Sequence, residues 1–338
     1  MFQALLEKLA RREDLSAGES AAAMAAIMDG TVSDAALAGF LTALAMKGEQ
    51  PAEIVGLART MRDRAVQLSK AYPDAVDLCG TGGDRSGTFN VSSIASVVVA
   101  ACGVTVAKHG NRSVSSRCGS ADLFDALGVP AATAPDLVER MLDEVGIAFL
   151  FARVFHPSMR HAAAARQALG LRTAFNLLGP LTNPVRPRWQ IVGVPRPELT
   201  EMIARALMLL GCERAWVVHG ADGLDELSTV GYTKVSECRH GTVNTFYVHP
   251  ADYGLARAAA ESLTGGDAAV NAAIARSVLG GTTGPARDIV LLNAGAALLV
   301  SGHATTVRDG IAMAGEAIDS GRARAVLAAM VALAGGSQ

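Results

Sequence analysis

Several features that would define a protein class are missing from this sequence. The five cysteines include no CxxC pair and are odd in number, which argues against a disulfide framework or a structural zinc site. The longest apolar stretches, residues 94–107 and 289–300, fall short of the roughly 20 residues that a membrane-spanning helix needs. The N-terminus is charged and amphipathic, without a signal-peptide core. We therefore expect a cytoplasmic protein without a membrane partner.

Charge and aromatic side chains are also scarce. The net charge is −2, which provides no electrostatic field for holding nucleic acid, so no nucleic-acid partner is expected. Aromatic residues make up 4% of the chain and charged residues 18%, whereas half of the 338 residues are hydrophobic. A chain of this length and composition buries a large core and has room for two domains.

The hydrophobic pattern divides the chain in two. Residues 1–70 show helical periodicity, with a capping box at Ser16 and Glu19 and with Pro51 suited to a first helical position. From Ala75 onward, short apolar strands alternate with helical segments, and a hairpin is expected around Gly241. Strands are predicted at 75–79, 104–107, 147–150, 190–194 and 216–219. This order predicts an α/β fold: a small all-helical domain (1–70) and a larger domain (71–338) with a mainly parallel sheet.

A glycine-rich loop follows the first predicted strand. It reads GTGGDRSGT at residues 80–88, and Asn90 can cap the helix that follows. Glycines let backbone N–H groups approach a ligand, and a helix N-terminus favours an anion, so the loop has the composition of a phosphate cradle. It matches neither a dinucleotide fingerprint nor a Walker A loop. A plain tight turn between strand and helix is the alternative, made less attractive by the hydroxyls of Thr88, Ser92 and Ser93.

Two further polar loops follow predicted strands. Residues 108–116, KHGNRSVSS, concentrate cations and hydrogen-bond donors, as an anion site requires; a solvated loop is the alternative. His109 is a possible acid or base, although a lone histidine is more often a packing group. Asp225 and Glu226 are adjacent hard-oxygen ligands that suit Mg²⁺ beside substrate phosphates, and a charged helix cap is the alternative. No nucleophile motif is present, so covalent catalysis is not indicated.

Five linked motifs carry a resemblance to a known family. DLCGTGGD, TFNVSS, KHGNRSVSSRCGSAD, RQALGLRTAFNLLGPLTNP and VHGADGLDELS occur in this order, and together they resemble anthranilate phosphoribosyltransferase. The resemblance runs from the N-terminal helices to about residue 330. It implies a small helical domain hinged to a larger α/β domain, as in the nucleoside phosphorylase/phosphoribosyltransferase fold, with a segment near 166–185 returning to the helical domain. It also implies a homodimer joined through the N-terminal helices.

The implied activity is a pentosyl transfer in tryptophan biosynthesis. Such enzymes move phosphoribosyl from 5-phosphoribosyl-1-diphosphate (PRPP) to the amine of anthranilate and release diphosphate. The implied magnesium ligands are Ser92, Asp225 and Glu226, holding Mg²⁺ that is expected to number two per monomer. Anthranilate would contact Gly80, Asn111 and Arg166. The implied PRPP site comprises Gly80, Gly83, Asp84, Thr88, Asn90, Val91, Ser92, Ser93, Lys108, His109, Gly110, Asn111, Arg112, Ser113, Val114, Ser115, Ser116 and Ser120.

Lys108 is expected to stabilise charge on the leaving diphosphate, and no general base is assigned, because the anthranilate amine can lose its proton late. The sequence departs from the family pattern at Arg85, where Gly is common, and at Ser93, where Thr is common. The segments around Arg153, Phe155 and Ala164 lack prolines often seen there. A nucleoside phosphorylase of similar architecture and a non-catalytic nucleic-acid-binding relative remain the alternatives.

Overall fold

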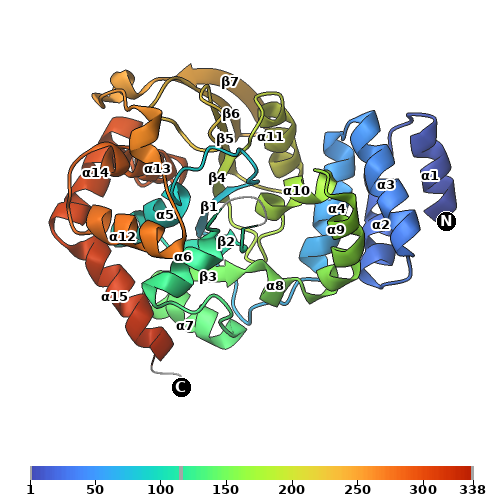
Figure 1. Cartoon of the computed structure of the whole chain (residues 1–338), viewed down its shortest axis with the longest axis horizontal. Coiled ribbons are helices and arrows are strands. Elements are labelled where there is room, and N and C mark those ends of the chain that lie inside the picture. The colour runs from blue at the N-terminus through green and yellow to red at the C-terminus, as the bar shows by residue number, and fades with distance from the viewer. Residues whose placement is uncertain (1, 114–116, 336–338) are drawn as a thin grey trace.

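The computed structural model describes residues 2–113 and 117–335, so Val114, Ser115 and Ser116 of the predicted PRPP site lie outside the described residues. Four helices form an N-terminal domain at one end of the molecule (Figure 1), and the α/β domain follows. The N-terminal helices are α1 (Phe2–Ala10), α2 (Ala17–Met28), α3 (Asp34–Lys47) and α4 (Pro51–Asp63). Ser16 and Glu19 form the predicted capping box on α2, and Pro51 opens α4.

A seven-stranded sheet organises the larger domain. The strand order is β3-β2-β1-β4-β5-β6-β7; the first five of these run parallel, and β6 and β7 form the predicted antiparallel hairpin at one edge. The strands are β1 (Val76–Gly80), β2 (Val106–Gly110), β3 (Ile147–Phe151), β4 (Trp189–Gly193), β5 (Arg214–Gly220), β6 (Thr233–Arg239) and β7 (Thr242–Val248). The predicted α/β class with a helical N-terminal domain is therefore confirmed.

Further helices pack on the sheet or against the N-terminal helices. They are α5 (Val91–Ala101), α6 (Ser120–Leu127), α7 (Pro135–Glu144), α8 (Ala152–Phe155), α9 (Ala163–Leu169), α10 (Ala174–Leu178), α11 (Leu199–Leu209), α12 (Ala268–Leu279), α13 (Pro285–Val300), α14 (Val307–Asp319) and α15 (Arg322–Gly335). Short 3₁₀ turns are η1 (Pro157–Ala162), η2 (Gly179–Leu181), η3 (Pro250–Tyr253) and η4 (Ala260–Leu263). No helix of the described ranges is long and apolar enough to cross a membrane.

Two apolar cores share the sheet, because successive side chains of a strand point to opposite faces. In β5, Trp216 and Val218 belong to a core with α5 and α13, whereas Ala215 and Val217 belong to a core with the N-terminal helices and α11. The second core also takes in α9 and α10, which lie beside α3 and α4 (Figure 1). The N-terminal helices are thus joined to the α/β domain through a continuous apolar interface.

Candidate functional site

The phosphate-type loop leaves β1 at its carboxyl end and enters α5. Gly82, Gly83 and Gly87 all take positive φ angles, of 69°, 80° and 70°, which L side chains rarely adopt. Arg85 adopts the same left-handed region, at φ 59°, where a non-glycine residue is uncommon. The loop is held from the next strand, because the Thr81 N–H donates to the Gly193 carbonyl over 2.9 Å. The glycines therefore shape a tight backbone curve at the helix N-terminus, as the composition predicted.

The acidic pair lies directly against this loop. Asp225 accepts a hydrogen bond from the Gly82 N–H over 2.9 Å, and Glu226 accepts one from the Ser92 N–H in the first turn of α5 over 3.1 Å. Neither carboxylate caps a helix of its own, because the loop after β5 continues without one. The structure therefore brings Ser92, Asp225 and Glu226 together, as the predicted metal site requires.

Two glycines make room for Asp225. A Cβ at Gly80 would overlap the Asp225 carboxylate, and a Cβ at Gly193 would overlap the Asp225 backbone carbonyl. Gly80 is a predicted site residue, whereas Gly193, the last residue of β4, was not identified from the sequence. Its role depends on β4 lying between β1 and β5, and a strand order is not readable from one loop motif.

The surroundings of both carboxyl groups disfavour their ionised forms. Burial, and then repulsion from Asp84, raise the pKa of Asp225 to about 7. Burial, and then the neighbouring Asp225, raise the pKa of Glu226 to about 8. Hydrogen bonds from backbone N–H groups oppose these shifts but do not cancel them. A bound cation would stabilise the ionised forms of Asp225 and Glu226.

The side chain of Arg172, which was not predicted as a site residue from the sequence, also contacts the loop. Arg172 donates from Nη1 to the Gly82 carbonyl over 2.8 Å, and its guanidinium fills the space where a Gly83 side chain would stand. Arg172 belongs to the segment that runs beside the N-terminal helices, between α9 and α10. Its sequence surroundings, GLRTAF, carried no signal beyond the presence of an arginine in a recognised motif.

The strand β2 is longer at its carboxyl end than predicted. Lys108, His109 and Gly110 were expected in a loop but form the end of β2. Lys108 is 2% exposed, and its ammonium donates to the Leu78 carbonyl. The His109 N–H donates to Asp77 of β1 over 3.1 Å. These polar residues stay in the sheet because the neighbouring strand provides a partner for each.

The remainder of the polar loop packs on α6. Asn111 accepts a hydrogen bond from the Ser120 hydroxyl over 3.3 Å at its carbonyl. Arg112 is paired over 2.6 Å with each of Asp122 and Asp125 of α6. The Ser113 N–H donates to Asp122 over 3.3 Å.

Asn90 occupies the N-cap position of α5 without capping it. Its side chain instead donates to the Cys118 carbonyl over 3.1 Å and accepts from Asn271 of α12 over 2.9 Å. The predicted cap is therefore wrong, because the Asn90 side-chain amide is hydrogen-bonded to Cys118 and Asn271 instead. Ser93 is buried, as is Val91, whereas Thr88 and Asp84 line a cavity of about 350 Å³ together with Arg85 and Arg117.

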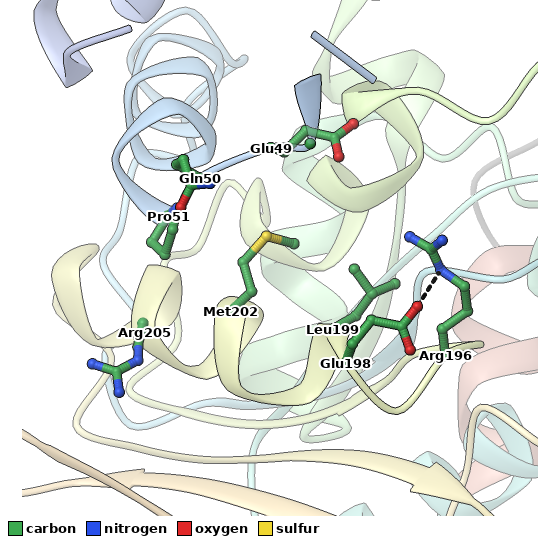
Figure 2. Close-up of a pocket in the computed structure, with 9 residues that line it drawn as sticks. Glu49, Gln50, Pro51, Arg196, Glu198, Leu199, Met202 and Arg205 are labelled. Atoms are coloured by element: carbon green, nitrogen blue, oxygen red, sulfur yellow. Dashed lines mark ion pairs between the residues drawn. The ribbon is translucent and has the colours of Figure 1, made fainter. Parts of the chain in front are cut away.

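A larger cavity of about 450 Å³ lies elsewhere, between the start of α4 and α11. Figure 2 shows Gln50 and Pro51 on one side, Met202 and Arg205 on the other, and an ion pair between Arg196 and Glu198 over 3.3 Å. None of the predicted site residues lines it. Of the predicted site residues, Asp84 and Thr88 line the smaller cavity beside the phosphate-type loop instead.

Arg166 lies on α9. Its guanidinium carbon lies 5.2 Å from the centre of the Phe175 ring, and no ion pair with an acidic side chain forms within the described ranges. Burial lowers the pKa of Arg166. A half-buried cation on an aromatic face is suited to receive a carboxylate from a ligand. Of the residues where the sequence departs from the family, Phe155 is buried in the core, and Arg153 and Ala164 are exposed.

His109 and His156 are buried beside each other, with ring centres 5.5 Å apart. His109 Nδ1 lies 2.9 Å from the Gly179 carbonyl, and His156 Nε2 lies 2.9 Å from the Thr182 carbonyl. Burial, and then repulsion between the two rings, lower the pKa of His109 to about 3, and burial lowers that of His156 to about 4. Both rings are therefore neutral near pH 7, and the carbonyls fix which nitrogen carries the proton.

The fold and the site define a two-domain transferase of the glycosyl transferase family. The a/b-domain model of that family matches residues 72–324, and its helical-bundle model matches residues 3–65. The chain is 54% identical over 332 residues to anthranilate phosphoribosyltransferase of Moorella thermoacetica, with 98% of each chain covered.

Two solved structures agree with this. The chain superposes on anthranilate phosphoribosyltransferase from Thermus thermophilus with a TM-score of 0.93 and 45% identity, covering 98% of this chain and 99% of that one. The enzyme from Saccharomyces cerevisiae, in complex with PRPP and Mg, gives a TM-score of 0.90 at 27% identity, with 99% and 98% coverage. The chain belongs to the anthranilate phosphoribosyltransferase family.

Proposed function

We propose that this chain transfers the phosphoribosyl group of PRPP to the amine of anthranilate, giving N-(5-phosphoribosyl)anthranilate and diphosphate in tryptophan biosynthesis. The observation that carries the proposal is the acidic pair Asp225–Glu226, which backbone N–H groups of the phosphate-type loop and of α5 hold in place. Metal-binding carboxylates fixed to a phosphate cradle are what a diphosphate leaving group requires. The family names and the solved complex with PRPP and Mg support this assignment.

PRPP is proposed to lie along the carboxyl ends of β1 and β2, on the residues assigned from the sequence. The loop from Gly80 to Thr88 and the N-terminus of α5 supply backbone N–H groups and hydroxyls. Lys108 adds a buried positive charge that also acts on Glu226, and is proposed to stabilise charge on the leaving diphosphate.

The donor set fits Mg²⁺. Asp225, Glu226 and the Ser92 hydroxyl are hard oxygen ligands, and the raised pKa values of the two carboxyl groups show that the site lacks compensating positive charge. No group of three or more His, Cys, Asp or Glu side chains in the described ranges could hold a metal alone, so substrate phosphates are proposed to complete the coordination. When bound, Mg²⁺, two per monomer in this proposal, neutralises negative charge on diphosphate.

The acceptor is proposed to enter from the side of the N-terminal helices. Arg166 would pair with the anthranilate carboxylate, and Gly80 and Asn111 would contact the rest of the ring and amine. A neutral aromatic amine attacks without prior deprotonation, so its proton can leave late. The neutral rings of His109 and His156 already use one nitrogen each on backbone carbonyls, and we assign neither as a base.

The direct test is a fluorescence assay that follows loss of anthranilate with PRPP, with and without Mg²⁺. Turnover is expected only when all three are present. Incubation with a purine or pyrimidine nucleoside and inorganic phosphate tests the nucleoside phosphorylase alternative in the same preparation. Phosphorolysis without anthranilate turnover would overturn the proposal.

We further propose a cytoplasmic homodimer joined through the N-terminal helices. All five cysteines are free thiols, which suits a reducing compartment. Met46 on α3 is 74% exposed, and Phe2 and Leu6 of α1 are only partly buried, so this end of the molecule presents apolar side chains to a partner. Light scattering of wild type and Met46→Glu tests the interface. The variant is expected to dissociate into monomers at a higher protein concentration than wild type.

A further inference from the structure

Two arginines line the cavity beside the phosphate-type loop, and neither was predicted as a site residue from the sequence. Arg85 lies in the loop itself, Arg117 lies shortly before α6, and both are exposed. Among the described residues, neither guanidinium forms an ion pair with an acidic side chain, whereas that of Arg112 is paired with two aspartates. Asp84 is the one carboxylate among the residues that line this cavity. The lining therefore carries an excess of positive charge.

The backbone of Arg85 adopts a conformation that is unfavourable for an arginine. Its φ angle of 59° lies in the left-handed region, which glycine and asparagine adopt at lower cost. The other described non-glycine residues with positive φ, Arg12, Arg186 and His240, do not line this cavity. Since a strained residue at a binding site can reflect a function, the guanidinium of Arg85 is a candidate for one.

The part of the loop that carries Arg85 is fixed in place by the chain before α12. The Gly265 N–H donates to the Gly87 carbonyl over 2.8 Å, and the Phe89 N–H donates to the Leu263 carbonyl over 3.3 Å. The two segments lie so close that a Cβ at Gly265 would stand 2.7 Å from the Phe89 backbone. Arg85 therefore extends from a supported backbone.

Arg117 is held close to the N-terminus of α5. The next residue, Cys118, accepts a hydrogen bond at its carbonyl from the side chain of Asn90 over 3.1 Å, and Asn90 is the N-cap residue of α5. Asn271, which also lines the cavity, donates to the same Asn90 side chain over 2.9 Å. A helix N-terminus attracts anions, and the two arginines add positive charge beside it.

We propose that Arg85, together with Arg117, binds a phosphate group of the substrate in a subsite that adds to the magnesium site at Asp225 and Glu226. A guanidinium presents paired N–H donors that match phosphate oxygens. The phosphate group belongs either to the diphosphate or to the 5-phosphate of PRPP. This assignment to PRPP rests on the proposed function, whereas binding of a phosphate anion at Arg85 does not.

The two sources of the phosphate group predict different kinetics when Arg85 is replaced. The 5-phosphate keeps its charge throughout the transfer, so loss of its contact should raise the KM for PRPP and leave kcat unchanged. The diphosphate gains negative charge as its bond to the sugar breaks, so loss of its contact should lower kcat as well. In both cases the KM for anthranilate should change little.

The deciding experiment is calorimetry of the full-length protein with two simple anions. Inorganic diphosphate with Mg²⁺, and ribose 5-phosphate, are each titrated into wild type and into Arg85→Asn, without anthranilate. Asparagine tolerates a positive φ, so this substitution removes the guanidinium without straining the loop. The Kd of one anion is expected to rise by about tenfold, as for the loss of one charge-assisted contact, and the affected anion identifies the source.

The matched control is Arg12→Asn. Arg12 is also an exposed arginine with positive φ, of 60°, but it lies after α1 in the N-terminal domain. This variant should bind both anions as wild type does. Arg85→Gly should weaken the same anion as Arg85→Asn, and Arg117→Gln should weaken it too. Thermal unfolding should show all four variants as stable as wild type or more stable, which confirms that they fold.

Three results would overturn the proposal. They are wild-type affinity of Arg85→Asn for both anions, weakening that is confined to Arg85→Gly and so reflects loop flexibility, and a wild type that binds neither anion. Wild-type affinity of Arg117→Gln would overturn the part assigned to Arg117. Loss of anion affinity in Arg85→Asn, from a wild type that does not turn over anthranilate, would support the subsite and count only against the proposed function.

Discussion

Replacing the acidic pair by neutral amides should make the metal-free protein more stable while removing its activity. The double substitution Asp225→Asn and Glu226→Gln keeps the size of both side chains but removes charges that burial and mutual repulsion disfavour. An acid whose pKa is raised in the folded state binds its proton more tightly when folded. Its contribution to stability is present at low pH and is lost as pH rises through the folded pKa. Wild-type stability should therefore fall between about pH 4 and pH 8.

The magnitude follows from the shifts. The pKa of Asp225 moves from 3.8 to about 7 and that of Glu226 from 4.5 to about 8. At 1.36 kcal/mol per unit this sets an upper limit of about 4–5 kcal/mol for each carboxyl group. Both groups are partly exposed, so solvent screening reduces the effect to about 2 kcal/mol each. The double variant should then melt on the order of 5 °C above wild type at pH 8.

Thermal unfolding between pH 5 and pH 8.5, in the presence of a chelator, measures this effect. Wild type and the double variant should converge at low pH and separate as pH rises. Glu213→Gln, which neutralises an exposed carboxylate before β5, is the matched control and should follow wild type. Mg²⁺ with diphosphate should increase the unfolding free energy of wild type only, by about 2.7 kcal/mol at 100 times the Kd. The melting temperature of wild type alone should therefore rise. Curves for wild type and double variant that coincide at every pH would refute the reasoning.

Three further changes test separate parts of the site. Gly193→Ala should lower kcat/KM by about 100-fold or more, or about 2.7 kcal/mol at 1.36 kcal/mol per tenfold, because the added Cβ displaces the Asp225 backbone. Gly231→Ala, where a Cβ has space, is the control. Equal activity of the two variants would contradict the packing argument. Arg166→Ala should raise the KM for anthranilate by about one to two orders of magnitude, since a charge-assisted contact contributes about 1.5–3 kcal/mol. PRPP binding measured by calorimetry should change little, and the opposite pattern would place Arg166 in the phosphate site. Arg172→Ala should weaken PRPP binding by about tenfold, since its bond to the Gly82 carbonyl supports the phosphate-type loop; unchanged PRPP affinity would make that bond dispensable.

Local chemistry was predictable from the sequence to the extent that it depends on neighbours in the chain. Glycines that must adopt positive φ, as at Gly82, and a capping box at Ser16 are specified within a few residues. The cap expected from Asn90 failed because its partners, Cys118 before α6 and Asn271 on α12, lie far along the chain. Gly193 and Arg172 were missed for the same reason: each acts on a loop that only the folded sheet brings close.

The segment that links α10 to the sheet accounts for several buried polar side chains at the contact between the domains. Gly179 to Thr182 leave α10 and re-enter the sheet, and each of their four consecutive carbonyls lies within hydrogen-bond distance of a buried side chain. These side chains are His109, Gln190, Arg62 and His156, in the order of the carbonyls from Gly179 to Thr182. Asn183 then donates to Asp77 over 2.9 Å.

A connecting segment can be buried only if its backbone N–H and carbonyl groups have hydrogen-bond partners. Here four side chains from separate parts of the chain provide partners for the carbonyls. The same bonds explain two features of the site. They fix the tautomers of both histidines, which burial keeps neutral, and they anchor the segment that follows Arg166 and Arg172 in the chain. A carbonyl deprived of its partner would be left buried and unpaired, at a cost of about 1–3 kcal/mol. The polar core of this interface is therefore best understood as the support that holds residues from both domains in one site.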